Sequence, residues 1–234
     1  SQPLCSPTRA TILTGRQPFQ HNVGTPQDSG LFSNGQDEIT LPEIFTSMNA
    51  PHSLLSVGKW HLGGQNNGYN SRGGWPEFYG IDRGGVQDYF NWTKNSNGTT
   101  ADTTVYSTTD QVNHATTFIE ENEANGTPWF AWVAFNAPHT PFHDPPPELA
   151  PDSGYSIQES GESNNQFRYR KALEALDTEI GRLLEAVNPA RTQVILLGDN
   201  GTPNQVVQAP FGEGNSKGDL YNGGIHVPMI AKGP

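Results

Sequence analysis

The chain has 234 residues, enough for one large domain or two small ones, and its 26 Gly and 19 Pro predict many ordered loops. The net charge of −11 argues against non-specific binding to nucleic acid or to an anionic membrane surface. No apolar run approaches the roughly 20 residues of a membrane span. The single cysteine, Cys5, excludes an intrachain disulfide and a cysteine-rich metal site. A local cluster of Lys, Arg and His would still allow an anionic substrate.

The first predicted helix begins directly after Cys5. Ser6 suits the N-cap, Pro7 suits the first helical position, and residues 8–14 would form the helix before Gly15 ends it. Cys5 would then lie at the positive end of the helix, where a thiolate is favoured. A lone cysteine is also often a buried structural residue. On these grounds alone both interpretations stay open.

The middle of the chain alternates between predicted strands, loops and helices. Residues 52–57 are typical of a strand that breaks at Gly58, whereas residues 63–104 carry little periodicity and predict long loops. A helix is predicted over residues 109–125. The apolar run at residues 128–135 predicts a fully buried strand.

The last third of the chain begins with another predicted long loop, residues 136–165, followed by a helix over residues 166–187. One face of this helix is apolar and is expected to be buried: Leu173, Leu176, Ile180, Leu183, Leu184 and Val187. Residues 193–197 predict a buried strand and residues 227–231 a further one. Helices that alternate with apolar strands predict an α/β sheet with helices on its faces.

Polar clusters lie at the ends of these strands or in the loops after them, where ligands bind in α/β sheets. They comprise residues 59–61, residues 139–143, the pair Asp199 and Asn200, and Lys217. Each has an ordinary alternative, such as a solvated lysine, a loop histidine or an Asp-Asn-Gly turn.

The amino-acid sequences of five stretches resemble those of the type I, formylglycine-dependent sulfatases. Residues 5–16 read Cys-Ser-Pro-Thr-Arg-Ala-Thr-Ile-Leu-Thr-Gly-Arg and residues 58–63 read Gly-Lys-Trp-His-Leu-Gly, which are similar to the two family signatures. Further similar elements are Ala-Pro-His-Thr-Pro at residues 137–141, Gly-Asp-Asn-Gly at residues 198–201, and the Lys-Gly to Val-Pro segment at residues 217–228. Their order and spacing match the family across nearly the whole chain.

This resemblance implies an alkaline phosphatase-like fold, with a large central, mostly parallel or mixed sheet flanked by helices. It identifies residues 1–234 as part of a sulfatase catalytic domain, without the N-terminal metal-binding strand and the C-terminal region. The implied activity is hydrolysis of sulfate esters, and the implied location is periplasmic, secreted or lysosome-like. A sulfated carbohydrate is preferred over a small aryl ester because the long loops carry aromatic residues: Trp75, Tyr79, Tyr89 and Trp92.

By the same resemblance, Cys5 is converted to Cα-formylglycine by a formylglycine-generating enzyme. The hydrated aldehyde is the nucleophile and forms a covalent sulfate ester. Arg9 and Lys59 stabilise its alkoxide, and His61 accepts the proton of the second hydroxyl. The thiol itself would be a poor nucleophile for this reaction, because a thiosulfate adduct has no easy internal route to release.

The resemblance also assigns sulfate binding and a metal site. Lys59, His139 and Lys217 bind the sulfate, and His139 is the preferred general acid for the leaving oxygen. Asp199 and Asn200, together with residue 5, hold a divalent cation, Ca²⁺ or Mg²⁺, which prefers oxygen ligands. Further ligands of the family lie in an upstream Asp pair, so the metal site within residues 1–234 is expected to be incomplete.

Two positions depart from the family pattern, since Asn222 stands where Glu is usual and His226 where Arg is usual. His143 is expected to line the substrate cleft without a catalytic role. Three alternatives remain: a phosphodiesterase or phosphonate monoester hydrolase of the same superfamily, a catalytically degenerate protein that binds sulfated glycans, and a thiol hydrolase that uses Cys5 with His61.

Overall fold

The computed structural model describes residues 2–26, 38–48, 52–63, 73–151 and 163–234. The helices are α1 (Cys5–Thr14), α2 (Pro18–His21), α3 (Leu41–Ser47), α4 (Ser107–Asn125), α6 (Asn164–Glu185) and α7 (Asn222–Ile225), with a 3₁₀ turn η2 (Asn204–Val206). The strands are β1 (Ser53–Lys59), β2 (Glu77–Ile81), β3 (Trp92–Ser96), β4 (Thr99–Thr103), β5 (Trp129–Ala134), β6 (Val194–Leu197) and β7 (Met229–Lys232).

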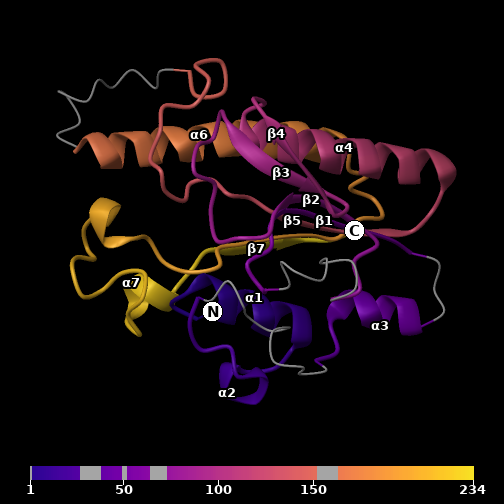
Figure 1. Cartoon of the computed structure of the whole chain (residues 1–234), viewed down its shortest axis with the longest axis horizontal. Coiled ribbons are helices and arrows are strands. Elements are labelled where there is room, and N and C mark those ends of the chain that lie inside the picture. Colours follow the sequence, from indigo (N-terminus) through magenta and orange to yellow (C-terminus); the bar gives the residue numbers. More distant parts are fainter. Residues whose placement is uncertain (1, 27–37, 49–51, 64–72, 152–162) are drawn as a thin grey trace.

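A five-stranded mixed sheet forms the middle layer, in the order β4-β3-β2-β1-β5. Strand β1 is parallel to both β2 and β5, and β3 and β4 continue the sheet antiparallel on the β2 side. A separate antiparallel pair consists of β6 and β7. Figure 1 shows α4 and α6 side by side on one side of the strands and α1 to α3 on the other. The predicted α/β class with a mixed central sheet is therefore confirmed.

Strand β1 contributes to two hydrophobic clusters because its side chains alternate between the two faces of the sheet. Leu54 belongs to a buried cluster with Ala10 and Leu13 of α1. Leu55 and Val57 face the other way, into the cluster that contains the buried face of α4. The sheet is thus covered by helices on both faces. This packing fixes the position of its carboxyl edge relative to both helix layers.

The prediction of long loops over residues 63–104 was wrong for its described part, which contains β2, β3 and β4. Strands β3 and β4 form a mostly polar hairpin, with the sequences Trp-Thr-Lys-Asn-Ser and Thr-Thr-Ala-Asp-Thr, that lacks an apolar alternation. Its turn is Asn97-Gly98, with φ values of 51° and 91°. Asn-Gly is the residue pair that a tight hairpin turn favours, so this turn was the available signal.

Helix α6 exists as predicted, but its buried face differs from the predicted leucine face. Leu173 is 40% exposed and Leu184 45% exposed. Of the predicted face only Leu183 is buried, as expected, and the other buried side chains of the helix are Lys171, Ala172, Ala175 and Glu179, the last of them 1% exposed. Glu179 accepts a hydrogen bond from Thr109 of α4 and forms an ion pair with Arg182 at 2.6 Å. A buried carboxylate needs such partners, and α4 supplies one of them from a distant part of the chain.

The strands predicted to be fully buried are more exposed than expected. Strand β5 is mostly half-buried, and in β6 the side chain of Ile195 is 52% exposed. The cause is pairing, because within the described residues β5 pairs with β1 alone and β6 with β7 alone. Each of these strands therefore has one edge without a described neighbour.

Strand β1 also continues past the predicted break at Gly58 and ends at Lys59. Gly58 has φ +94°, and a Cβ atom there would lie 2.1 Å from the carbonyl oxygen of Ala134 in β5. Glycine at this position lets β1 and β5 pair right up to their carboxyl ends.

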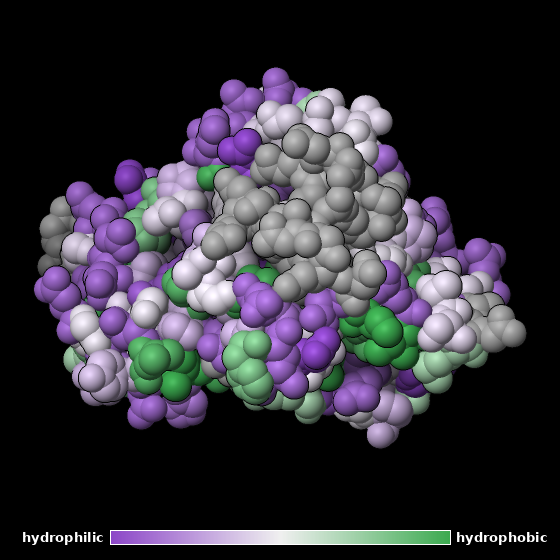
Figure 2. All heavy atoms as spheres, turned by 60° about the horizontal axis from the view of Figure 1, so that its bottom comes forward, coloured by the Kyte–Doolittle hydropathy of each residue, from purple (hydrophilic) through white to green (hydrophobic). Residues whose placement is uncertain are grey.

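Figure 2, in which the side with α1 to α3 comes forward, shows a largely hydrophilic surface with separate apolar groups. Exposed apolar side chains from these helices include Phe19, Ile44 and Met48. None of the helices in the described ranges is long and apolar enough to cross a membrane.

Gly58→Ala should lower the free energy of unfolding by about 2–4 kcal/mol, because it combines a left-handed φ with a clash against the Ala134 carbonyl. The measurement is chemical denaturation of the full-length protein. Gly181→Ala is the matched control, since that α6 glycine has open space around its Cβ position, and it should gain up to about 1 kcal/mol. Equal stabilities of the two variants would contradict the prediction.

Candidate active site

Residues that are far apart in sequence meet at the carboxyl edge of the main sheet. Lys59 is the last residue of β1, and His139 lies in the loop that follows the parallel neighbour β5. Helix α1 begins at Cys5 itself, with Leu4 as its N-cap. The predicted cap, Ser6, instead uses its hydroxyl to donate to the carbonyl of His61 at 2.8 Å. The start of α1 is therefore fixed to the end of β1 by a tertiary contact.

Arg9 joins the three segments that form the centre of the site. Its side chain is buried, and Nη1 donates to the carbonyl oxygen of Lys59 at 2.6 Å. Nη2 donates to Oδ2 of Asp199 at 3.3 Å, in the loop after β6. One guanidinium therefore holds α1, the end of β1 and the Asp199 loop together, which suits its rigid fork of donors.

Lys59 is only 3% exposed and lies among charged groups. Burial and the positive charge of Arg9 lower the pKa of Lys59 to about 8, and Lys217 acts in the same direction. The charges of Cys5 and Asp199 oppose this effect by favouring the ammonium. At neutral pH Lys59 is still mainly charged, so it can attract an anion.

Asp199 remains a carboxylate in this environment. Burial alone would favour its neutral acid, but Arg9, Lys59 and Lys217 hold the pKa of Asp199 below its usual value. Asp199 is therefore an ionised oxygen donor at the end of β6.

The two histidines are held differently. His61 has φ +56°, and its backbone N–H donates to the carbonyl of Asp82 at 3.1 Å. His139 is half-buried, and burial together with Lys59 lowers the pKa of its ring to about 4. Nδ1 of His139 lies 3.0 Å from the carbonyl of Thr140. A carbonyl only accepts, so Nδ1 carries the proton and Nε2 presents a lone pair.

Asn200 offers an oxygen that no described residue satisfies. Its Nδ2 donates to the carbonyl of Gly201 at 2.9 Å, whereas its buried Oδ1 has no hydrogen-bond partner among the described residues. A buried orphan acceptor is costly unless a ligand takes its lone pairs. Together with the carboxylate of Asp199 it fits a hard cation. The described ranges contain no group of three or more His, Cys, Asp or Glu that could hold a metal ion, so this oxygen pair is a partial set.

Close backbone packing brings Lys217 to the site. The N–H of Lys217 donates to the carbonyl of Thr202 at 2.9 Å, and the N–H of Gly218 donates to Pro3 at 3.0 Å. A Cβ atom on Gly201 would lie 1.8 Å from the carbonyl oxygen of Gly223. Glycines at this contact therefore let the two loops touch. The structure brings Cys5, Arg9, Lys59, His139, Asp199 and Lys217 into one electrostatic cluster, and His61 lies two residues after Lys59.

Of the four aromatic residues that suggested a carbohydrate platform, only Tyr79 is half-buried, and its ring stacks on that of His114. Trp75 and Tyr89 are 1% exposed and Trp92 is 4% exposed, so all three belong to the core. His143 packs with the same core, because its ring stacks on Tyr89 at 3.8 Å and its Nε2 lies 2.9 Å from Oη of Tyr106.

Sequence reasoning missed Tyr169, a residue of α6. Burial raises the pKa of its phenol, a side-chain hydrogen bond with Thr202 lowers it, and the charge of Asp199 raises it further. Tyr169 therefore lies beside the oxygen pair. A single tyrosine on an amphipathic helix carries no signal for this placement.

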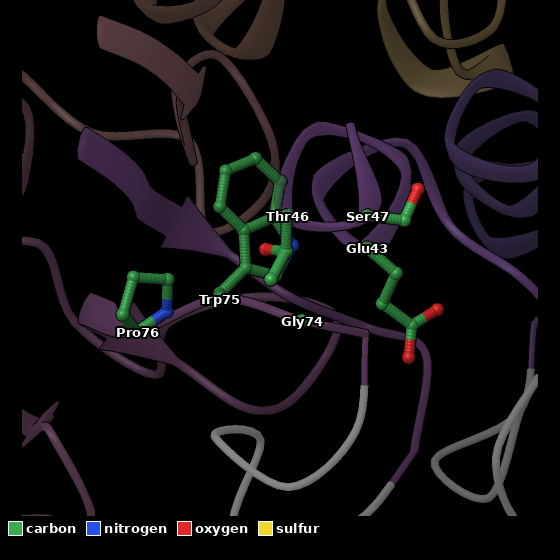
Figure 3. Close-up of a pocket in the computed structure, with 6 residues that line it drawn as sticks. All are labelled: Glu43, Thr46, Ser47, Gly74, Trp75 and Pro76. Atoms are coloured by element: carbon green, nitrogen blue, oxygen red, sulfur yellow. The ribbon is translucent and has the colours of Figure 1, made fainter. Parts of the chain in front are cut away.

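A depression of about 440 Å³ between α3 and the chain before β2 is lined by none of the predicted site residues (Figure 3). Its lining residues are Glu43, Thr46, Ser47, Gly74, Trp75 and Pro76.

Known proteins resemble this chain over its whole length. The sulfatase family model matches residues 1–234. N-acetylgalactosamine-6-sulfatase of Canis lupus familiaris is 26% identical over 277 residues, which cover 100% of this chain and 49% of that protein. The ulvan-active sulfatase of Formosa agariphila is 26% identical over 259 residues, which cover 99% of this chain and 47% of that protein. The crystal structure of Ps i-CgsB in complex with k-i-k-neocarrahexaose matches with a TM-score of 0.81 and 24% identity, covering 100% of this chain and 56% of that one.

The mixed sheet and its flanking helices are thus those of part of a sulfatase catalytic domain. The chain belongs to the sulfatase family. It spans about half the length of the curated relatives that it matches.

Because the pKa of Lys59 is lowered to about 8, the affinity for an anion should fall as the pH rises through that value. Isothermal titration of the full-length protein with inorganic sulfate should show affinity weakening by up to about tenfold per pH unit above pH 8. Lys217→Gln removes a charge that lowers this pKa, so the midpoint should move to higher pH. An affinity that stays flat to pH 10 would contradict the prediction.

Proposed function

We propose that this domain is part of a sulfuric ester hydrolase that removes sulfate from a carbohydrate. The observation that supports this best is the meeting of the buried residues Cys5, Arg9 and Lys59 with the partly exposed carboxylate of Asp199. The carbohydrate substrate is supported by the names of the relatives, N-acetylgalactosamine-6-sulfatase and ulvan-active sulfatase. Trp75, Tyr89 and Trp92 give it no support, because they are buried.

Sulfate ester hydrolysis needs a nucleophile, positive charge around the sulfuryl oxygens and a proton for the leaving alcohol. We infer that Cys5 is converted to Cα-formylglycine by a formylglycine-generating enzyme. One hydroxyl of the hydrated aldehyde attacks sulfur, the alcohol leaves with a proton, and residue 5 carries the sulfate ester. Loss of the second hydroxyl's proton then expels sulfate and restores the aldehyde.

Basic residues surround the position of this chemistry. Arg9 and Lys59 stabilise the alkoxide of residue 5, and Lys59 and Lys217 bind the sulfate. His61 accepts the proton of the second hydroxyl. Their positive charge is local, which reconciles an anionic substrate with the net charge of −11.

His139 serves the leaving oxygen. Without a bound anion its ring is neutral at neutral pH, because burial and Lys59 lower its pKa to about 4. The negative charge of a bound sulfate ester offsets the lysine charges and raises this pKa, so the ring can hold the proton that the leaving alcohol needs. Protonation of His139 is thus coupled to substrate binding.

Asp199 and Asn200, with residue 5, would hold a divalent cation, Ca²⁺ or Mg²⁺. The supporting observation is the buried Oδ1 of Asn200, which has no hydrogen-bond partner among the described residues. When bound, the cation adds positive charge beside the nucleophile and the sulfate. Chain outside residues 1–234 would complete the ligand set and cover the exposed apolar side chains of β6, such as Ile195.

The proposal is tested by mass spectrometry of the Cys5 peptide from the full-length protein, co-expressed with a formylglycine-generating enzyme. The expected species is the aldehyde in place of the thiol. The same preparation should hydrolyse sulfate monoesters in preference to phosphate monoesters and diesters, and Cys5→Ala should lower kcat by at least about a thousandfold.

The other outcomes identify the alternatives. A strong preference for phosphodiesters would indicate the phosphorus-directed branch of the superfamily. An unmodified thiol without turnover would indicate a protein that only binds sulfated glycans. Rapid inactivation by alkylating agents of a protein whose thiol is intact and active would indicate a thiol hydrolase. Residues 1–234 alone should show little activity.

Removal of the orphan oxygen should weaken metal binding. Asn200→Ala should reduce the affinity of the full-length protein for Ca²⁺ by at least about tenfold, measured by isothermal titration without substrate. Asn188→Ala is the matched control, because its Oδ1 only accepts from the N–H of Ala190 in the turn after α6. Unchanged Ca²⁺ affinity in Asn200→Ala would argue against Asn200 as a ligand.

A further inference from the structure

The chain that follows β2 lies against both histidines of the site. A Cβ atom on Gly84 would lie 2.6 Å from Cε1 and 2.7 Å from Nε2 of His61. A Cβ atom on Gly85 would lie 3.0 Å from Nδ1 and 3.3 Å from Cε1 of His139. Neither glycine has a left-handed φ, so an L residue could adopt the backbone conformation. A side chain at Gly84 would overlap the ring of His61, and one at Gly85 would press on the ring of His139.

Tyr89, a few residues further on, anchors the backbone of the second histidine. Its side chain is 1% exposed, and its hydroxyl lies 2.9 Å from the carbonyl oxygen of Asn136 and 2.8 Å from that of His139. The N–H of His139 donates to the same Asn136 carbonyl at 2.9 Å. One phenol thus joins both ends of the turn that carries His139.

The sheet explains why one short segment reaches both rings. Strands β2 and β5 flank β1 and run parallel to it, so all three end at the same edge. His61 follows β1, and its N–H is bonded to the Asp82 carbonyl where the segment begins. From this fixed start, the backbone at Gly84 lies against the ring of His61, and the backbone at Gly85 lies against the ring of His139.

We propose that residues 84–89 are a positioning segment that fixes the two histidine rings of the site relative to each other. Gly84 fixes the orientation of the His61 ring and Gly85 that of the His139 ring. Tyr89 fixes the position of the His139 backbone. The inference rests on the proposed function, in which the two rings handle different protons. Transfer of each proton depends on ring orientation, and a displacement of about 1 Å can cost about 100-fold in rate.

The contact is tested without reference to turnover. The full-length protein is labelled with ¹³C in its histidine rings, and the two Cε1–Hε1 signals are assigned by their loss in His61→Gln and His139→Gln. Gly84→Ala should shift the His61 signal and leave that of His139 nearly unchanged, and Gly85→Ala should do the reverse. Gly212→Ala is the matched loop control, since its Cβ position has open space, and it should shift neither signal.

Steady-state kinetics test whether the contacts with the histidines matter for turnover. Gly84→Ala should lower kcat for a sulfate ester about 10–100-fold while KM changes less than about threefold, because ring orientation affects proton transfer more than sulfate binding. Tyr89→Phe keeps the ring and should fold normally, but it should lower kcat about tenfold and shift the His139 signal. Tyr106→Phe removes the contact to His143 and the hydrogen bond with Thr108, neither of which involves His61 or His139, and it should leave kcat unchanged.

Unshifted histidine signals in both alanine variants would overturn the proposal, as would shifted signals with wild-type kcat. An equal fall of kcat in Tyr89→Phe and Tyr106→Phe would also overturn it, because it would reflect general damage to the aromatic core. If the wild-type protein hydrolyses no sulfate ester while each variant shifts its own ring, the proposed function fails and the positioning of the rings is upheld.

Discussion

The buried guanidinium of Arg9 is the interaction on which the site depends. It bonds the carbonyl of Lys59 and the carboxylate of Asp199 at once, and thereby ties helix α1 to the end of β1 and to the loop after β6. Strands β6 and β7 form a sheet of their own among the described residues, so no ladder fixes Asp199 relative to Lys59. The ion pair and the contact of Gly218 with Pro3 provide that connection.

The same ion pair sets the electrostatic balance. The carboxylate of Asp199 is surrounded by Arg9, Lys59 and Lys217, so positive charge is in excess. Lys59 and His139 both have lowered pKa values, which in part reflects repulsion by neighbouring cations. An anion placed among them relieves the repulsion, and the site is therefore selective for negative charge although the chain as a whole is acidic.

The sequence predicted the site better than the packing around it. Short motifs marked Cys5, Lys59 and His139, and parallel strands that end at one edge bring such motifs together. Packing partners come from distant segments and leave no local pattern. Glu179 is buried because Thr109 on another helix binds it, and the β3–β4 hairpin is polar because part of it faces solvent. No periodicity encodes these choices.

The contacts of Gly84 and Gly85 with the histidines could not be predicted from the sequence either, although they lie within the site. Gly84 and Gly85 look like an ordinary loop in the sequence, where paired glycines usually indicate a turn. Their φ values are not left-handed, so backbone conformation does not require glycine there. The requirement comes from the imidazole rings of His61 and His139, which follow two neighbouring strands, and only the folded sheet places a ring 2.6 Å from a Cβ atom on Gly84 and 3.0 Å from one on Gly85. Gly84 and Gly85 thus provide space for the histidine rings to approach the backbone closely.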